Sequence, residues 1–463
     1  IAERELGIKH KKEILELGVE KFNDICRSKV LAYVDEWKAV MRRFGRFVDM
    51  ENAYRTMDRD YMESVWWVFK ELWDKGLVYE SYRVMHVCPH CETTLSQQEV
   101  SEGYMDVKDL AVTAKFELKD EPGTYLLAWT TTPWTLPGNV ALAVGKDIEY
   151  VKIEQEDESG VKVYFIVAKD LVEKNFGTEG YEVVETFLGA TLLGKSYTPP
   201  FEYYVNDQSL ENRENGWKIY HADFVTTEMG TGIAHEAPAF GEEDMELSKV
   251  ENLPFVQHVK MDGTMKDEVT DFAGMDVKEK DNPQATDIEI IKYLAKKGLL
   301  FSKEKYEHSY PHCWRCDTPL LNYATSSWFV SVVDIKEKAL KNAEKIHWSP
   351  EHIKAGRFGK WLEGAKDWSI SRQRFWASVI PLWKCECGEM KVFGSVAELE
   401  KLSGKKVDDL HKHVVDMIEV PCEKCQKMMK RIPDVLDTWF DSGSMPYAQM
   451  HYPFGNKEAF EKS

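Results

Sequence analysis

Apolar residues recur at helical spacing in two long segments near the start of the chain. Residues 19–45 and 59–76 both show this pattern, which predicts helices. Gly76 and Gly298 each follow a helical pattern and precede a strand-like run, which is a common way for a helix to end. The run VKVYFIVA at 161–168 predicts a strand, and TDIEIIKYLAKKG at 286–298 predicts a later helix.

The chain divides into three regions. Residues 1–104 are expected to be mostly helical, residues 105–305 to alternate strand-like runs with turns, and residues 306–463 to carry the last cysteine pairs and a Trp-rich stretch. A length of 463 residues suits several domains. The net charge of −19 argues against wholesale wrapping of nucleic acid, although it leaves room for a local basic surface.

One stretch, residues 124–145, carries no charge in a chain that is 30% charged. It is long enough to span a bilayer, which needs about 20 residues. However, it is rich in threonine, and Pro133 and Pro137 would break a helix. We therefore expect no membrane segment, and because no secretory signal is visible we expect a cytoplasmic protein.

Eight of the nine cysteines form four close pairs, and Cys26 stands alone in a helical segment, where a buried thiol is expected. Disulfides are one explanation, but a chain without a secretory signal favours metal. Thiolates two or three positions apart can bind one tetrahedral Zn²⁺. The paired cysteines are Cys88 and Cys91, Cys313 and Cys316, Cys385 and Cys387, and Cys422 and Cys425.

Local similarity indicates which cysteine pairs share a metal. CPHCETTL and CWRCDTPL have the same pattern of Cys-x-x-Cys, an acid, Thr, any residue and Leu. We infer one Zn²⁺ site from the pairs at 88/91 and 313/316, which would join the two ends of a large insertion, and a second from the pairs at 385/387 and 422/425. With four thiolates each, both sites are expected to be structural. His90 or His312 replacing a cysteine is the less favoured alternative.

A second stretch in the insertion, residues 227–245, combines a glycine-rich turn with His235 and an acidic run. In the turn MGTGIA, glycines would let the backbone approach a ligand closely. Each feature has a purely structural explanation: threonine-rich strands are common, a lone histidine is more often structural, and Glu242 to Asp244 suit a helix start. Together they suggest a site for a neutral or cationic polar substrate.

These two stretches, WTTTPWTLPGN and GTGIAHEAPAFGEED, resemble the editing motifs of the isoleucyl-tRNA synthetase family, which is a class I family. ENAYRTMDRDYMESVWW, the paired cysteine knuckles, WSISRQRFW and DVLDTWFDSGSMPYAQMHYPF also resemble this family. The resemblance implies an α/β fold: an incomplete Rossmann-type catalytic core, interrupted by a β-rich editing domain at 105–305, with two zinc-ribbon or knuckle sites. Valyl and leucyl relatives have Arg before the motif proline, where this chain has Thr132.

The resemblance implies that the insertion hydrolyses valine wrongly attached to isoleucine tRNA. Asp244 would bind the α-ammonium group of valine, and His235 would form a wall that excludes isoleucine. Other residues would line the pocket and hold the terminal ribose and the attacking water: Thr130, Thr131, Thr132, Thr135 and Asn139. Trp134 is expected to pack the loop. Because no strong general base is evident, we expect a positioned water.

Residues 354–376 reverse the charge of the chain, with six basic and two acidic side chains. They could be a basic surface helix and turn, or contact tRNA or nucleotide through Lys360, Arg372 and Arg374, which the resemblance favours. By resemblance, Trp439 would line the isoleucine pocket, while Asp437 and Asp441 would structure their loop. Ala377 stands where the family has Gly, which puts the local geometry in doubt.

Activation of an amino acid with ATP and Mg²⁺ uses the motifs H-x-G-H and K-M-S-K-S in this family, and neither is present. We therefore expect a piece of a longer, monomeric enzyme whose substrates are isoleucine tRNA, isoleucine and ATP. This piece would retain editing but not adenylate formation. The alternatives are a valyl-tRNA synthetase piece, a zinc-ribbon scaffold that only binds RNA, and a self-standing deacylase.

Overall fold

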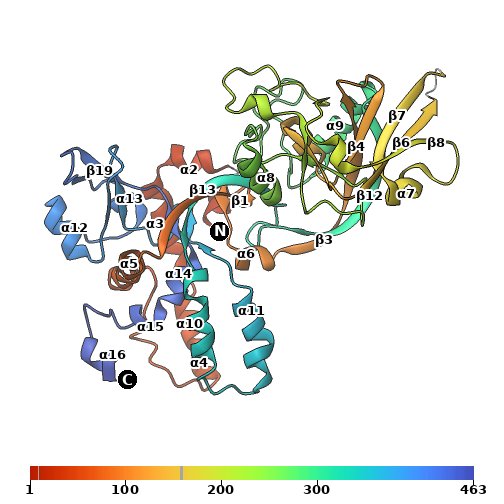
Figure 1. Cartoon of the computed structure of the whole chain (residues 1–463). Coiled ribbons are helices and arrows are strands. Elements are labelled where there is room, and N and C mark those ends of the chain that lie inside the picture. Colours follow the sequence, from red (N-terminus) through yellow and green to blue (C-terminus); the bar gives the residue numbers. More distant parts are fainter. Residues whose placement is uncertain (9, 157–159, 463) are drawn as a thin grey trace. The chain divides into compact units, whose positions relative to one another are not determined.

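The computed structural model describes residues 1–8, 10–156 and 160–462, which divide into two compact units (Figure 1). Unit 1 comprises Ile1–Ser81 and Ser326–Ser463, and unit 2 comprises Tyr82–Thr325. Strands β1 (Val78–Cys88) and β13 (Leu321–Val330) run from one unit into the other. The division between the units falls at 81/82 and 325/326, outside the boundaries at 104/105 and 305/306 that the sequence suggests, so both halves of the first cysteine knuckle belong to unit 2.

Unit 1 combines helices with short strands. Its helices are α1 (Ala2–Leu6), α2 (Lys11–Leu17), α3 (Val19–Val30), α4 (Val34–Arg43), α5 (Arg59–Asp74), α10 (Val333–Ala343), η5 (Lys354–Phe358), α11 (Gly359–Glu363), α12 (Val396–Ser403), α13 (Lys412–Val415), α14 (Thr438–Gly443), α15 (Met445–Ala448) and α16 (Lys457–Lys462). Its remaining strands are β14 (Trp368–Ser369), β15 (Ser371–Arg372), β16 (Leu382–Lys384), β17 (Met390–Val392), β18 (Val420–Pro421), β19 (Met428–Arg431) and β20 (Val435–Leu436).

The predicted helix over 59–76 is confirmed by α5, whose apolar face includes the fully buried Trp66 and Phe69. The helical pattern over 19–45 is confirmed by α3 and α4, which are separated by a turn at residues 31–33. Helices draw most of their stability from tertiary packing. Because α4 buries none of its residues, tertiary packing contributes little to its stability.

Strand pairs within unit 1 are short and antiparallel where their register is described. β15 pairs with β20, and β16 lies between β17 and β19. A Rossmann-type core rests on a parallel sheet. That core therefore stays an expectation about the longer enzyme.

Unit 2 is rich in strands, as expected for this part of the chain. Its strands are β2 (Thr93–Thr94), β3 (Tyr104–Leu118), β4 (Thr124–Thr130), β5 (Ala141–Val144), β6 (Glu149–Glu156), β7 (Lys162–Ala168), β8 (Glu182–Leu188), β9 (Tyr197–Thr198), β10 (Lys218–His221), β11 (Ile233–Glu236) and β12 (Leu300–Pro311). Its helices are α6 (Gln97–Ser101), η1 (Pro133–Gly138), η2 (Lys169–Leu171), α7 (Val172–Phe176), η3 (Gly189–Leu192), η4 (Arg213–Asn215), α8 (Glu242–Glu251) and α9 (Ala285–Lys296).

Two sheets organise unit 2. A seven-stranded sheet has the order β12-β3-β4-β7-β6-β8, with β9 added beside β3, and a three-stranded sheet has the order β10-β5-β11. The strand predicted at 161–168 is confirmed by β7, and the late helix by α9, which packs against β3, β12 and η1 (Figure 1). The shared core of the unit includes Val112, Phe116 and Leu142.

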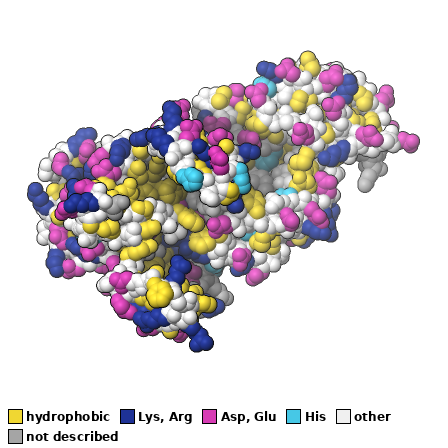
Figure 2. All heavy atoms as spheres, turned by 90° about the horizontal axis from the view of Figure 1, so that it is seen from below, with side chains coloured by type: hydrophobic (Ala, Val, Ile, Leu, Met, Phe, Trp, Pro, Cys, Tyr) yellow, Lys and Arg dark blue, Asp and Glu magenta, His cyan; other side chains and the backbone are white. Residues whose placement is uncertain are grey.

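The surface mixes charge with isolated apolar groups. Figure 2 shows acidic and basic side chains interspersed over one face of the molecule, with hydrophobic side chains between them. On α4 and the loop after it, Trp37, Phe44 and Phe47 are largely exposed. Within the described ranges, no helix is both long and apolar enough to cross a bilayer.

Candidate functional site

The threonine-rich segment forms a sharp turn between two sheets. β4 of the large sheet ends at Thr130, the short helix η1 follows, and β5 of the small sheet begins at Ala141. The backbone N–H of Thr132 donates to Thr130 Oγ1 at 3.1 Å, and the Thr132 hydroxyl lies 3.2 Å from Thr130 Oγ1 and 3.4 Å from Thr135 Oγ1. The turn therefore gathers three hydroxyls into one cluster, with the half-buried Thr131 beside it.

His235 joins this cluster from β11. Its Nε2 lies 2.8 Å from Thr135 Oγ1, and its Nδ1 lies 3.2 Å from Asn139 Nδ2. Asn139 Nδ2 also donates to the carbonyl of Ala141 at 2.8 Å, so this atom is the amide nitrogen. An amide nitrogen only donates, so Nδ1 of His235 is the acceptor and Nε2 carries the proton. His235 Nε2 then donates to Thr135, whose own hydroxyl donates to the Thr132 carbonyl at 2.8 Å.

This cluster is electrically neutral at physiological pH. Burial, with a smaller contribution from His258, lowers the pKa of His235 to about 3. An imidazole with such a pKa is uncharged near pH 7 and is a poor general base there. Asn139 is held further by Tyr197, whose hydroxyl donates to Asn139 Oδ1 at 2.7 Å. The hydrogen-bonded group thus joins five of the side chains that the sequence singles out: Thr130, Thr132, Thr135, Asn139 and His235.

Asp244 lies in the first turn of α8, where the sequence predicts a helix start. Its Oδ2 accepts a hydrogen bond from the backbone N–H of Ala237 at 2.7 Å, two residues beyond His235 in the chain. Gly241 makes this arrangement possible, because a Cβ at position 241 would lie 2.3 Å from Asp244 Oδ1. Burial raises the pKa of Asp244 to about 6. The carboxylate is therefore mostly ionised at pH 7 and able to bind a cation.

The glycine-rich turn serves packing within the unit. Gly232 has a φ of +75°, which favours glycine, and a Cβ there would lie 2.4 Å from the Cβ of Ala168. The sequence predicts close approach to a ligand, but the close approach in the structure is to strand β7. The two sheets of unit 2 can meet here because residue 232 has no side chain.

Glu236, the neighbour of His235 on β11, is a fully buried carboxyl group that the sequence analysis does not single out. Neither carboxyl oxygen has a hydrogen-bond partner among the described residues. Burial, and then the nearby Asp244 and Glu243, raise the pKa of Glu236 well above its ordinary value. No local sequence pattern predicts the raised pKa of Glu236, because the strand pattern alone does not show which neighbouring residues will exclude water.

The eight paired cysteines meet as two clusters, with the grouping expected from their sequence patterns. The sulfur atoms of Cys88 and Cys316 are 3.5 Å apart, and those of Cys385 and Cys425 are 3.4 Å apart. A disulfide needs about 2.05 Å, whereas thiolates around one tetrahedral Zn²⁺ lie about 3.8 Å from each other for Zn–S bonds of about 2.3 Å. Within each cluster all four sulfurs lie within 4.8 Å of one another, so each could hold a metal ion.

The three basic residues singled out in unit 1 have different surroundings. Lys360 on α11 is exposed, and Arg374 is half-buried with one guanidinium nitrogen lacking a hydrogen-bond partner among the described residues. Arg372 is buried, donates to the carbonyls of Ser369 and Ser371, and binds Asp437 Oδ2 at 2.7 Å. The Arg372 charge is thus satisfied internally, so this guanidinium is less suited to a phosphate than the other two side chains.

Trp439 lies at the start of α14, and its side chain is 41% exposed. Asp437 caps this helix, because its Oδ1 accepts the backbone N–H of Trp439 at 3.1 Å. Asp437 also accepts the indole N–H of Trp368 at 3.0 Å. These bonds agree with the expectation that Asp437 structures the loop, and they leave the Trp439 indole available to a ligand.

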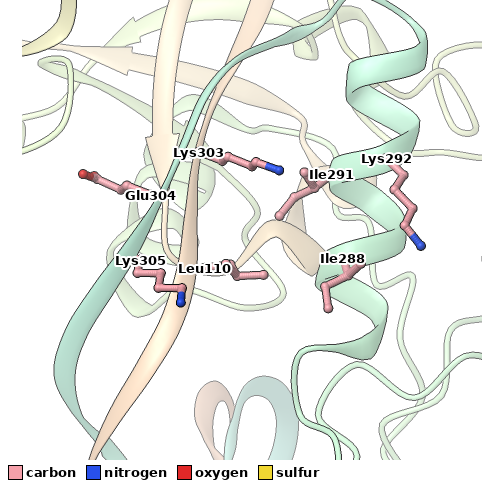
Figure 3. Close-up of a pocket in the computed structure, with 7 residues that line it drawn as sticks. All are labelled: Leu110, Ile288, Ile291, Lys292, Lys303, Glu304 and Lys305. Carbon is pink, nitrogen blue, oxygen red and sulfur yellow. The ribbon is translucent and has the colours of Figure 1, made fainter.

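A cavity of about 340 Å³ lies between α9 and the strands β3 and β12 (Figure 3). Its lining combines apolar residues with charged ones: Leu110, Ile288, Ile291, Lys292, Lys303, Glu304 and Lys305. None of these is a residue that the sequence analysis singles out. Figure 3 shows Ile291 and Lys303 pointing into the space between the helix and the strands.

Comparison with known proteins agrees with the family resemblance. A family described as tRNA synthetases class I (I, L, M and V) matches residues 1–463. The isoleucine–tRNA ligase of Treponema denticola is 48% identical over 494 aligned residues, which cover 100% of this chain and 44% of that protein. The isoleucine–tRNA ligase of Clostridium tetani is 46% identical, with 100% and 43% covered. The chain thus spans less than half the length of these relatives.

Among solved structures, a complex of an Agrobacterium radiobacter LeuRS with tRNA is 17% identical and covers 96% of this chain and 49% of that one. Its TM-score is 0.30, which is too low to support a conclusion about the fold.

Replacing Glu236 by Gln is expected to stabilise unit 2, and more so at higher pH. A carboxyl group whose pKa is raised by folding weakens the fold as pH rises above its unfolded pKa, by up to about 1.4 kcal/mol per pH unit. The advantage of Glu236→Gln in urea unfolding should therefore be larger at about pH 8 than at about pH 5. Glu243→Gln, at an exposed acid on α8 that makes the smallest contribution to the raised pKa of Glu236, is the control and should show a much smaller change with pH. An equal advantage at both pH values would contradict this account.

Proposed function

The chain belongs to the class I tRNA synthetases of the I, L, M and V group, and on that basis we propose that it is the editing portion of an isoleucine–tRNA ligase. The complete enzyme would charge isoleucine tRNA with isoleucine, using ATP and Mg²⁺. The part described here would hydrolyse valine from tRNA that has been charged wrongly. The observation that carries this proposal is the neutral cluster of Thr130, Thr132, Thr135, Asn139 and His235, with the half-buried carboxylate of Asp244 close to it in the chain.

Isoleucine and valine differ by one methylene group. A hydrophobic pocket can discriminate between them by only about 1–3 kcal/mol of binding free energy, and this enzyme family is the usual example. A second, hydrolytic site that accepts only the smaller amino acid raises the accuracy. A neutral wall suits such a site, because a buried unpaired charge would be costly. His235, uncharged and bound on both ring nitrogens, would provide that wall.

Hydrolysis at this site would depend on a positioned water. The threonine hydroxyls would hold the terminal ribose and the water, while Asp244 would bind the α-ammonium group. His235 does not suit the role of general base, since its pKa is about 3 and its Nδ1 already accepts a hydrogen bond. The reaction would therefore rely on orientation of the water and the ester rather than on proton abstraction by a side chain.

Contacts outside the editing site are also part of the proposal. Lys360 and Arg374 would contact tRNA or nucleotide, with Arg372 acting mainly inside the fold, and Trp439 would line the isoleucine pocket of the complete enzyme. Thr132 before Pro133 disfavours a valyl enzyme. An RNA-binding scaffold without catalysis can be distinguished from an editing enzyme by substitution of Asp244, because RNA binding alone would not need this carboxylate.

Hydrolysis of valine-charged isoleucine tRNA should increase as pH rises through about 6, where Asp244 ionises. Replacing Asp244 by Asn should lower kcat/KM by at least about tenfold, since a charge-assisted hydrogen bond contributes about 1.5–3 kcal/mol. It should also remove the rise near pH 6. Release of radiolabelled valine, corrected for uncatalysed hydrolysis, measures both effects.

Glu243→Gln is the matched control, because Glu243 is the adjacent acid on α8 and is exposed. It should leave the rate near pH 7 almost unchanged and move the rise near pH 6 only slightly to lower pH, because Glu243 makes the smallest contribution to the raised pKa of Asp244. Equal activity of Asp244→Asn and Glu243→Gln would overturn the assignment of Asp244. Hydrolysis that is absent from the unsubstituted, folded chain would instead favour the RNA-binding scaffold.

We propose that both cysteine clusters hold Zn²⁺ as structural ions. Purified protein should contain about two zinc ions per chain by elemental analysis. Cys313→Ser should remove about one ion and destabilise unit 2, whereas Cys26→Ser, at the cysteine outside the clusters, should retain both ions. A folded chain that contains iron, or less than one metal ion, would contradict the assignment.

A further inference from the structure

The residue at the centre of the threonine turn is held at both of its backbone groups. The N–H of Trp134 donates to Asp287 Oδ1 at 3.0 Å, and the carbonyl of Trp134 lies 2.8 Å from His258 Nε2. A carbonyl oxygen only accepts, so His258 Nε2 carries the proton. Both side chains come from segments more than 120 positions further along the chain.

Asp287 is fixed in place by a buried group of charges. It lies in the first turn of α9 and is 1% exposed. Lys278 Nζ lies 3.6 Å from Asp287 Oδ2 and 3.6 Å from Asp109 Oδ2, and it sits over the ring of Tyr310. The lysine therefore balances two aspartates, of which only Asp287 contacts the threonine turn.

His258 is fixed by packing rather than by charge. It is fully buried, and its ring lies edge-on to Phe240 at a centroid distance of 4.9 Å. A Cβ at Gly138 would lie 2.4 Å from His258 Nδ1, so the ring occupies the space that this glycine leaves at the end of η1. The imidazole has little freedom to move away from the Trp134 carbonyl.

We propose that Asp287 and His258 are positioning residues that hold the Trp134 peptide, and through it the hydroxyls of Thr132 and Thr135, in the geometry that hydrolysis needs. Trp134 lies between these two threonines, whose hydroxyls are 3.4 Å apart. A displacement of about 1 Å can lower a rate by about a hundredfold. The inference rests on the proposed editing function, but the hold on the turn can be measured without activity.

The decisive comparison is between Asp287 and Asp109. Asp287→Ala removes a partner of Lys278 and also the bond to the turn. Asp109→Asn weakens a partner of the same lysine but leaves that bond in place, so it controls for loss of stability. Asp287→Asn tests rescue, because its amide oxygen can still accept the Trp134 N–H.

Hydrolysis of valine-charged tRNA should separate these variants at a temperature where all are folded. Asp287→Ala should lower kcat by at least about tenfold with little change in KM, because the ester still binds but the water and hydroxyls are misplaced. Asp287→Asn should recover most of kcat, and Asp109→Asn should keep it despite a lower Tm. Equal kcat losses for Asp287→Ala and Asp109→Asn would overturn the proposal.

Amide hydrogen exchange of the peptide spanning 130–139 gives a readout that does not require activity. Exchange should accelerate in Asp287→Ala and remain slow in Asp109→Asn. If the unsubstituted chain does not release valine, the proposed function fails and exchange alone decides whether the turn is held in this way. Unchanged exchange in Asp287→Ala would overturn the hold.

If Asp287→Ala does not fold, two variants of His258 provide an alternative test of the hold on the Trp134 backbone. His258→Gln keeps a donor for the Trp134 carbonyl, whereas His258→Leu does not. His258→Leu should show lower kcat and faster exchange of 130–139, and His258→Gln should be closer to the unsubstituted chain. Indistinguishable behaviour of these two variants would count against the proposal.

Discussion

The bond between Thr135 and His235 is the interaction on which the candidate site depends. It joins the turn after β4 to strand β11, and so connects the large and small sheets of unit 2 through side chains that are both uncharged. Burial keeps the imidazole neutral, and Asn139 selects its tautomer. A charged histidine here would repel an α-ammonium group and would cost free energy to bury, so neutrality serves both stability and the proposed chemistry.

The charged side chains near the neutral cluster of Thr135 and His235 lie outside that cluster. Asp244 is ionised near pH 7 although its pKa is raised, while the pKa of Glu236 is raised well above its ordinary value by burial and by the nearby Asp244 and Glu243. Lys278 compensates Asp287 and Asp109 beside α9. Unit 2 thus combines an uncharged hydrogen-bonded cluster with the carboxylate of Asp244, and this combination would suit the aminoacyl ester that we propose as its substrate.

Much of this arrangement could be predicted from local sequence, and some could not. The grouping of the cysteines follows from two similar eight-residue patterns, and the ends of α5 and α9 follow from Gly76 and Gly298. The roles of Asp287 and His258 depend on contacts with Trp134 across more than 120 positions, which no local pattern encodes. The sequence places Arg372 in a basic stretch that could contact tRNA or nucleotide. Its pairing with Asp437 is a tertiary contact, and because the pair is buried, this contact decides the role of Arg372.

We propose that the cluster around His235 discriminates between amino acids by size. The most direct measurement compares kcat/KM of this chain for isoleucine tRNA charged with valine and with isoleucine. The account predicts release of valine well above the uncatalysed rate and release of isoleucine close to it, because the extra methylene would meet the His235 wall. Equal release of both amino acids by a folded chain would contradict the account.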